Sequence, residues 1–346
     1  MIRSSDKQLL NMMILEILKQ YTDQNHRLQQ NEIIDMLGKN YNVVCSRKTL
    51  YNNLQALREA GYDISTNGRL GGTCLLARDL DDGELYLLIE SVLFSRTMSQ
   101  KQAKTLIRKL EGMASQHFHK NVAHVCDLPD LQHSDNEQVM ENVDVISTAI
   151  TRRRKIRFLY MTYGTDFKQH PKREKPDVVN PYQVVANNGH FYLIGNYDKY
   201  DNVCHLRIDR MTQVEEVDEP VKTMKKISGL ENGLLLPKHM AEHLYMFSGP
   251  SVHVVMEAPV TMMDELIDWF GKDFRIINKA DDRMEIRVTV NEEAMFYWAL
   301  QYGPFVEVKS PEKLRDEIRD AVSDMAAKYS GEKGKGHADE QFIQSP

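Results

Sequence analysis

The first 78 residues combine three short helical patterns with a glycine-rich hairpin, and few folds accommodate that order. Ser46 precedes the third pattern and is a suitable N-cap. The loop between the two strands contains Asn67-Gly68 and Gly71-Gly72, residue pairs that accept positive φ. The predicted helices are Asp6–Tyr21, Gln29–Gly38 and Thr49–Ala60, and the predicted strands are Tyr62–Ile64 and Cys74–Leu76. This order indicates a winged helix-turn-helix.

The third helix carries the residues from which we predict DNA binding. Its apolar stripe leaves a polar face, on which arginine suits a guanine edge and asparagine suits adenine. No acidic residue lies between Ser46 and Gln55, so nothing there repels phosphates. Arg69, in the hairpin, is placed to reach a phosphate or the minor groove. The predicted DNA-binding residues are Ser46, Arg47, Lys48, Thr49, Tyr51, Asn52, Asn53 and Arg69.

A polar helix face has a second interpretation, because many such faces simply meet solvent or dock a protein. A small protein-interaction module therefore stays open as an alternative. A salt titration separates the two, since DNA affinity falls steeply with salt when several phosphates are neutralised.

Composition limits the compartment and the chemistry. The formal net charge is −6, which excludes a uniformly basic coat but not a local basic face. The four cysteines form no CxxC pair and have no nearby histidine at zinc spacing, so we expect neither disulfides nor a metal site. No apolar run approaches the roughly 18 residues of a membrane span. We expect a cytoplasmic protein without a membrane partner or a cofactor.

Residues 150–210 are β-rich and locally basic. Asn187-Asn188-Gly189 is a strong turn signal between two strands. The segment holds twelve lysines and arginines against six aspartates and glutamates, a net charge of +6. Interleaved aromatic residues favour an anionic ligand that stacks, such as single-stranded nucleic acid or a nucleotide. The predicted strands are Ile156–Tyr163, Val178–Ala186, His190–Tyr197 and Cys204–Ile208.

Four motifs in this segment resemble the WYL family of bacterial transcription regulators. They are Arg157-Phe158-Leu159-Tyr160, Val179-Asn180-Pro181-Tyr182, Phe191-Tyr192-Leu193-Ile194-Gly195 and His205-Leu206-Arg207-Ile208-Asp209-Arg210-Met211. The tryptophan of the family's name-giving triplet is replaced here by Phe191. The resemblance implies an N-terminal winged helix, a linker, a Sm-like β-barrel WYL domain and a C-terminal α/β extension. It further implies an effector site made of Tyr160, Arg173, Tyr192, His205, Arg207 and Arg210.

Each of these groups also has a structural interpretation. Phe191 and Leu193 alternate with Tyr192, so one face of their strand is expected to be core. Arg207 and Arg210 are alternatively partners of Asp209 or other carboxylates. An enzyme is not expected, because the chain contains no nucleophile elbow, P-loop, GxGxxG, HExxH or kinase motif set.

The whole chain is therefore predicted to be an α+β multidomain regulator. Its domains are predicted as a winged helix-turn-helix (1–78), a helical linker or dimerisation region (79–136), the WYL effector-sensing domain (137–225), a connector (226–250), a small C-terminal α/β domain (251–330) and a disordered tail (331–346). The expected partners are double-stranded DNA, the anionic effector and a second copy of the chain, because two-fold DNA sites gain affinity from symmetry. A DNA-binding protein whose WYL domain has no switching role is the alternative.

Overall fold

The computed structural model describes residues 4–66, 71–118 and 134–330. The chain separates into two compact units, Met1–Glu137 and Gln138–Pro346. Arg69, Cys126 and the predicted tail lie outside the described residues. None of the helices in the described ranges is long and apolar enough to cross a membrane.

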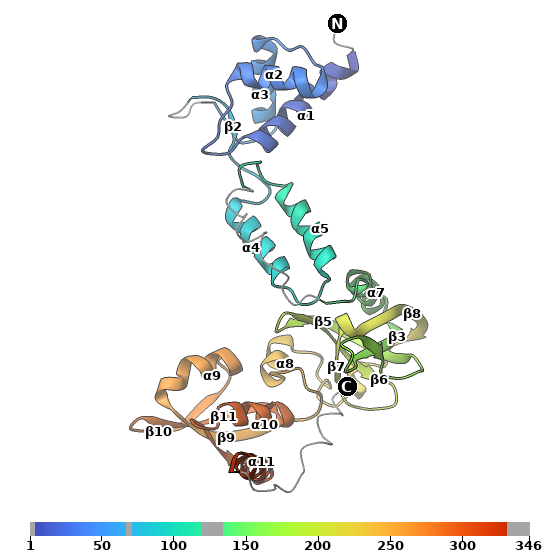
Figure 1. Cartoon of the computed structure of the whole chain (residues 1–346), viewed down its shortest axis with the longest axis vertical. Coiled ribbons are helices and arrows are strands. Elements are labelled where there is room, and N and C mark those ends of the chain that lie inside the picture. Colours follow the sequence, from blue (N-terminus) through green and yellow to red (C-terminus); the bar gives the residue numbers. More distant parts are fainter. Residues whose placement is uncertain (1–3, 67–70, 119–133, 331–346) are drawn as a thin grey trace. The chain divides into compact units, whose positions relative to one another are not determined.

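The first unit begins with three helices and a short hairpin, in the order that the sequence predicts (Figure 1). Leu28 and Thr73 exchange two backbone hydrogen bonds. This isolated antiparallel bridge places the Leu28 backbone beside the hairpin. The core between these helices is made of leucine and isoleucine side chains from each of them. The elements are α1 (Ser4–Tyr21), α2 (Gln30–Tyr41), α3 (Arg47–Glu59), β1 (Ile64–Ser65) and β2 (Cys74–Leu75).

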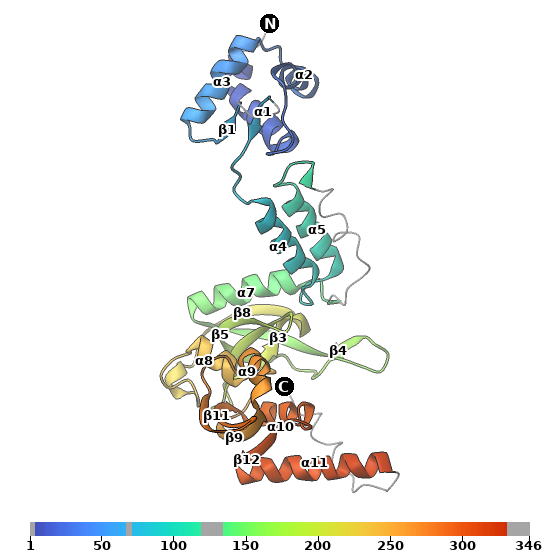
Figure 2. The same cartoon turned by 90° about the vertical axis from the view of Figure 1, so that its left-hand side faces the viewer.

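Two capped helices complete the first unit. α4 (Asp82–Leu93) and α5 (Gln100–Glu111) lie side by side (Figures 1 and 2). Asp81 and Glu84 form a capping box on α4, and Ser99 caps α5. Leu85, Ile89 and Ile107 are buried between the two helices.

The second unit begins with a helix that packs on a curled antiparallel sheet (Figure 2). The strand order is β4-β3-β5-β6-β7, and β8 pairs with β3. The predicted turn is confirmed, since Asn188 and Gly189 both have positive φ between β5 and β6. The elements are α7 (Val139–Arg152), β3 (Arg154–Tyr163), β4 (Gln169–Pro171), β5 (Asp177–Asn187), β6 (His190–Tyr197), β7 (Cys204–Arg207), the 3-10 turn η1 (Ile208–Arg210) and β8 (Met211–Pro220).

A short connector leads to a four-stranded sheet. The connector contains a 3-10 turn, η2 (Met224–Lys226), and a helix, α8 (Leu236–Glu242). The sheet order β10-β11-β9-β12, with all neighbours antiparallel and two helices between strands, is that of a split βαβ, or ferredoxin-like, fold. Its elements are β9 (Ser251–Pro259), η3 (Val260–Met262), α9 (Met263–Phe270), β10 (Arg275–Ala280), β11 (Arg283–Asn291), α10 (Glu292–Gln301), β12 (Glu307–Ser310) and α11 (Glu312–Ser330).

Strand β8 changes the interpretation of the basic segment. The net charge of +6 was calculated for residues 150–210, and the next ten residues add four acidic side chains and no basic one. These acids pair with the cations at the start of β3: Arg154 with Asp218 at 2.9 Å and Arg157 with Glu215 at 2.6 Å. Lys155 pairs with Glu219 at 2.9 Å and also with Asp198. The expected surplus of positive charge is therefore mostly neutralised across strands β3 and β8.

Candidate DNA interface and effector site

The exposed face of α3 is the candidate DNA interface. Leu50, Leu54 and Leu57 point into the core, and the Ser46 hydroxyl caps the helix by accepting from the Thr49 N–H at 3.1 Å. Lys48, Tyr51 and Asn52 are exposed and follow one another at i, i+3 and i+4. Among the described residues, no side-chain hydrogen bond or ion pair engages any of these three. They form a solvent-facing stripe, which we call the α3 stripe.

The other predicted DNA-binding residues that the structure describes, all of them on or next to α3, are already bonded. Arg47 donates to the Asn31 side chain at 3.0 Å, and Asn53 donates to the Thr49 carbonyl at 2.7 Å. The Thr49 hydroxyl lies 2.8 Å from the Ser46 hydroxyl. These residues therefore shape the helix start, whereas the α3 stripe is available for a partner.

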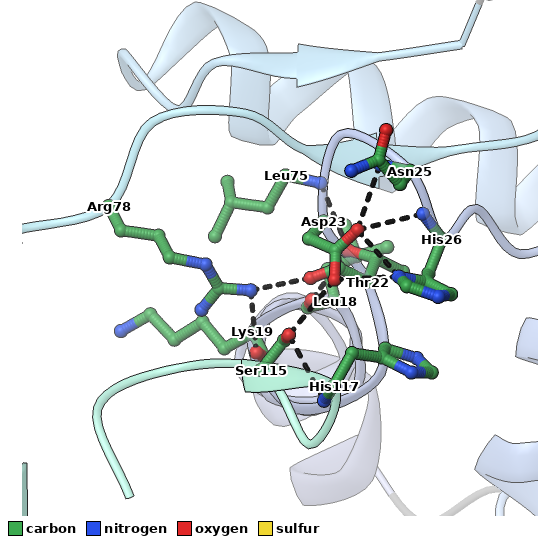
Figure 3. A network of polar contacts seen from close by, with 10 residues as sticks. All are labelled: Leu18, Lys19, Thr22, Asp23, Asn25, His26, Leu75, Arg78, Ser115 and His117. Carbon is green, nitrogen blue, oxygen red and sulfur yellow. Dashed lines mark hydrogen bonds and ion pairs between the residues drawn. The ribbon is translucent and has the colours of Figure 1, made fainter. Parts of the chain in front are cut away.

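A network of polar contacts links the end of α1 to the segment just before α4 and the segment just after α5 (Figure 3). Arg78 donates to the carbonyls of Lys19 and Thr22, at 2.7 and 2.6 Å. Asp23 accepts from Ser115 at 3.1 Å and from His26 Nδ1 at 2.8 Å, and the His26 ring stacks on His117. Burial opposes ionisation of Asp23, but the hydrogen bonds from His26, Asn25 and Ser115 hold its pKa below the ordinary value.

In the predicted effector site, Arg207 is bonded to a buried carboxylate. Its guanidinium donates to both Asp209 oxygens, at 3.1 and 2.7 Å, and approaches His190 Nδ1 at 3.0 Å. Asp209 is only 4% exposed. Burial opposes the charge on Arg207, but this pairing raises its pKa. Arg207 therefore has the partner that the structural interpretation of the sequence anticipated.

Tyr160 contacts the backbone of this arginine. Its hydroxyl accepts from the Arg207 backbone N–H at 3.3 Å, and burial raises its pKa to about 12. Tyr192 is half-buried on β6, and burial raises its pKa as well. Leu193 and the packed ring of Phe191 belong to the sheet core, as the alternation predicted.

Three further cations in this region are close enough to influence one another. The Arg210 Nε atom is buried without a hydrogen-bond partner in the part of the chain that the structure describes. Lys172 lies next to Tyr160, donating its backbone N–H to the Tyr160 carbonyl at 2.8 Å. Partial desolvation and the charges of Arg173 and Arg210 lower the Lys172 pKa. Arg173 is exposed and pairs with Asp177 at 3.1 Å. An anion placed here would relieve the repulsion among the cations; we call Lys172, Arg173 and Arg210 the cationic cluster.

His205 is buried away from solvent, at 3% exposed. Its Nε2 lies 2.8 Å from Nε2 of His239 on α8, and its ring centroid is 4.9 Å from that of His243. Burial and the neighbouring rings lower the pKa of His205, and burial lowers that of His239 to about 4. Sequence reasoning left His205 without a partner, although the His239-x-x-x-His243 spacing on a helix was the signal that could have supplied one.

The Asn180-Pro181-Tyr182 motif holds the connector against the sheet. The buried Asn180 side chain donates to Asp198 at 2.7 Å and to Asn196, and it accepts from the Lys222 N–H at 2.8 Å. The Tyr182 hydroxyl donates to the Lys222 carbonyl at 2.9 Å. This motif is therefore structural, and sequence reasoning did not assign it a role.

Two domain family models match parts of the chain. Residues 141–216 match the WYL domain model, and residues 250–326 match the WCX domain model. An uncharacterised HTH-type transcriptional regulator of Bacillus subtilis (strain 168), YobV, is 22% identical over 298 residues, which cover 82% of this chain and 90% of YobV.

Two solved structures are also similar to the chain. Proteasome accessory factor B/C (PafBC) of Arthrobacter aurescens matches with 18% identity and a TM-score of 0.30 over 93% of this chain, which spans about half (49%) of the PafBC chain. A CRISPR Cas-related protein matches with 15% identity and a TM-score of 0.37, over 73% of this chain and 75% of its own. Both TM-scores are below 0.5, so neither structure supports a functional assignment.

Proposed function

We infer, from the premise that this chain is a WYL-domain transcriptional regulator, that residues 1–78 form a winged helix-turn-helix that binds double-stranded DNA. The observation that carries the proposal is the α3 stripe: three exposed side chains without partners among the described residues, opposite a leucine core. An α-helix with its side chains is about 10–12 Å in diameter, which suits a major groove about 12 Å wide.

The contacts follow from the side chains. Asn52 suits an adenine edge, Lys48 suits a phosphate or guanine, and the Tyr51 ring and hydroxyl suit the sugar-phosphate backbone. Ser46, Arg47, Thr49 and Asn53 hold the helix start, and Arg69 stays a predicted wing contact outside the described residues. We propose that a homodimer reads two such half-sites.

The test is a fluorescence-anisotropy titration with duplex DNA from upstream of the chain's own gene. A Lys48→Glu/Asn52→Ala variant is expected to lose roughly 100-fold in affinity, because it loses a base contact and repels phosphates. Lys104→Glu, an exposed lysine on α5, is the charge-matched control and is expected to bind like the wild type. Unchanged binding by the α3 variant would contradict the assignment and favour a protein-interaction module.

We further propose that the WYL domain binds an anionic effector, single-stranded nucleic acid or a nucleotide, at the cationic cluster. The buried Arg210 Nε atom and the lowered Lys172 pKa support this position, and Tyr192 offers a half-buried ring for stacking. Arg207, Tyr160 and His205 would act by holding the sheet in shape. The effector changes DNA binding only if its affinity differs between two arrangements of the protein.

One observation favours the alternative without a switch. Of the six residues predicted to contact an effector, Arg207 is paired with Asp209, and His205 and Tyr160 are buried. Effector sensing and switchless DNA binding are distinguished by repeating the duplex titration with a short single-stranded oligonucleotide and then with nucleotides. A shift in duplex affinity that Arg210→Ala abolishes supports sensing, and no shift with either ligand supports a switchless DNA-binding protein.

A further inference from the structure

We propose that His205, His239 and His243 form a binding site for one divalent first-row transition-metal ion, of which Zn²⁺ is the probe. The proposal is independent of DNA binding and of the effector. The three imidazoles come from two segments that fold against each other: His205 from β7 and the other two from α8 and its C-cap.

The geometry brings one ligand atom of each ring to a common point. These three nitrogens lie within 4.8 Å of one another. In a tetrahedral zinc site with Zn–N bonds of about 2.0–2.1 Å, ligand nitrogens are separated by about 3.3 Å. The 2.8 Å between the Nε2 atoms of His205 and His239 is therefore about half an ångström short of that value. The separations that involve His243 are at most 4.8 Å, so they would close by at most about 1.5 Å when an ion is bound.

The surroundings suit a metal ligand set. His243 Nδ1 lies 2.9 Å from the His239 carbonyl oxygen. When Nδ1 carries the proton and donates it to that oxygen, Nε2 is left with the lone pair that can bind a metal. His205 Nδ1 is buried without a hydrogen bond of normal geometry, and Phe247 supplies the backbone carbonyl that acts on this ring. Backbone carbonyls that face the outer side of ligand imidazoles are the usual second partners of zinc-bound histidines.

The donor set determines the class of ion. Three imidazoles without a carboxylate disfavour Mg²⁺ and Ca²⁺, which prefer oxygen, and suit Zn²⁺, Ni²⁺ or Cu²⁺. Three protein ligands leave one position of a tetrahedral ion for water or another small ligand. Because α8 also contacts β11 and α9, the ion would fix the connector between the two sheets of the second unit.

A second histidine cluster provides the natural comparison. Asp23, His26 and His117 also bring ligand atoms within 4.8 Å, but His26 is exposed. Its Nδ1 is bonded to both Asp23 oxygens, at 2.8 and 2.9 Å. The buried trio has no such internal carboxylate partner, so its lone pairs are the better ligands.

The experiment uses the full-length protein without an affinity tag, stripped of metal with a chelator. Zn²⁺ is titrated against a chromophoric competitor, and the loaded protein is measured by zinc X-ray absorption spectroscopy. We expect one tightly bound Zn²⁺ per chain, a first shell of three imidazoles at about 2.0 Å, and a higher melting temperature with Zn²⁺. Absence of tight binding, or a shell that includes a carboxylate, would overturn the proposal without any variant.

Variants locate the ion. His239→Gln/His243→Gln is expected to lower Zn²⁺ affinity by more than roughly 100-fold. Substituting a group that only hydrogen-bonds to a metal ligand already costs about 10–100-fold. His26→Gln, in the other cluster, and His253→Gln, an exposed histidine on β9, are the matched controls and are expected to retain the site. Retained binding in the double variant, or its loss in His26→Gln, would assign the ion elsewhere and refute the proposal.

Discussion

The α3 stripe and the WYL sheet both contain a basic residue, an asparagine and a tyrosine, but they use these residues differently. On α3, Lys48, Tyr51 and Asn52 face solvent and bond to no side chain in the described ranges. In the sheet, Arg207 and Asn180 are bonded to partners far away in sequence or across a turn. Similar residue types therefore form a solvent-facing surface in one region and an internal polar network in the other.

The difference follows from how each element exposes its side chains. A helix with a leucine stripe has a solvent face fixed by its own period. A curled sheet has two faces that other segments cover, here the core on one side and the connector on the other. The partners of a strand residue are therefore set by long-range packing. The same kind of substitution, made in both regions, tests this contrast.

The largest difference in stability is expected between substitutions of two arginines near the end of β7. Arg207→Ala leaves Asp209 buried without its main cation and is expected to cost about 3–5 kcal/mol of unfolding free energy. Arg210→Ala removes no side-chain hydrogen bond in the described structure and is expected to leave stability nearly unchanged. Urea unfolding of both variants measures the difference. Equal losses would show that Arg210 is as structural as Arg207 and would remove it from the candidate effector site.

The next prediction compares the loss of stability on substituting two asparagines. Asn180→Ala deletes a buried amide that bonds Asp198, Asn196 and Lys222, with an expected cost of about 2–4 kcal/mol. Asn52→Ala, on the α3 stripe, is expected to change stability by less than about 0.5 kcal/mol. Thermal unfolding compares them directly. A stable Asn180→Ala protein would mean that the motif does not hold the connector.

A pair of tyrosines gives a smaller contrast. Tyr182→Phe removes the hydrogen bond to the Lys222 carbonyl and is expected to cost about 1 kcal/mol. Tyr51→Phe, with an exposed hydroxyl, is expected to be neutral for stability and to weaken only duplex binding. Both are measured by urea unfolding, with anisotropy for Tyr51→Phe. Destabilisation by Tyr51→Phe would show that the Tyr51 hydroxyl is bonded within the protein rather than free for DNA.

The smallest effect depends on pH. The folded-state pKa of Asp23 is lowered, so its contribution to stability is present above its ordinary pKa of 3.8 and is lost as pH falls through the folded value. Melting temperatures of the wild type and Asp23→Asn are therefore expected to differ at pH 6 and to converge below about pH 4. A difference that persists at low pH would assign the loss to geometry rather than charge.

The sequence predicted the helices of the first unit and most strands of the sheet within a few residues, because apolar period and caps are local signals. It missed β8, whose four acidic residues give no strand signal, and therefore overestimated the positive charge of the sheet. It also missed α8, where proline and histidine obscure the helical pattern. β8 is placed by its pairing with β3, and α8 is placed by its contacts with β11, α9 and His205 of β7.

The candidate sites divide in the same way. The face of α3 follows from Leu50, Leu54 and Leu57 alone, so its exposed residues could be named from the sequence. The pairing of Arg207 with Asp209 was open, since two residues along the chain can point together or apart. The His239-x-x-x-His243 spacing indicated that these two histidines share a helix face, but their contact with His205, 34 or more residues away, depends on long-range packing and could not be derived from local pattern.

The central claim is that the α3 stripe binds duplex DNA. Its most direct test is the salt dependence of duplex affinity for the wild type and for Lys48→Glu/Asn52→Ala. We expect tight binding at low salt, a linear fall of log affinity with log salt, and a shallower slope in the variant because one phosphate contact is lost. Duplex binding that is absent at low salt, or a slope and affinity identical in both proteins, would contradict it.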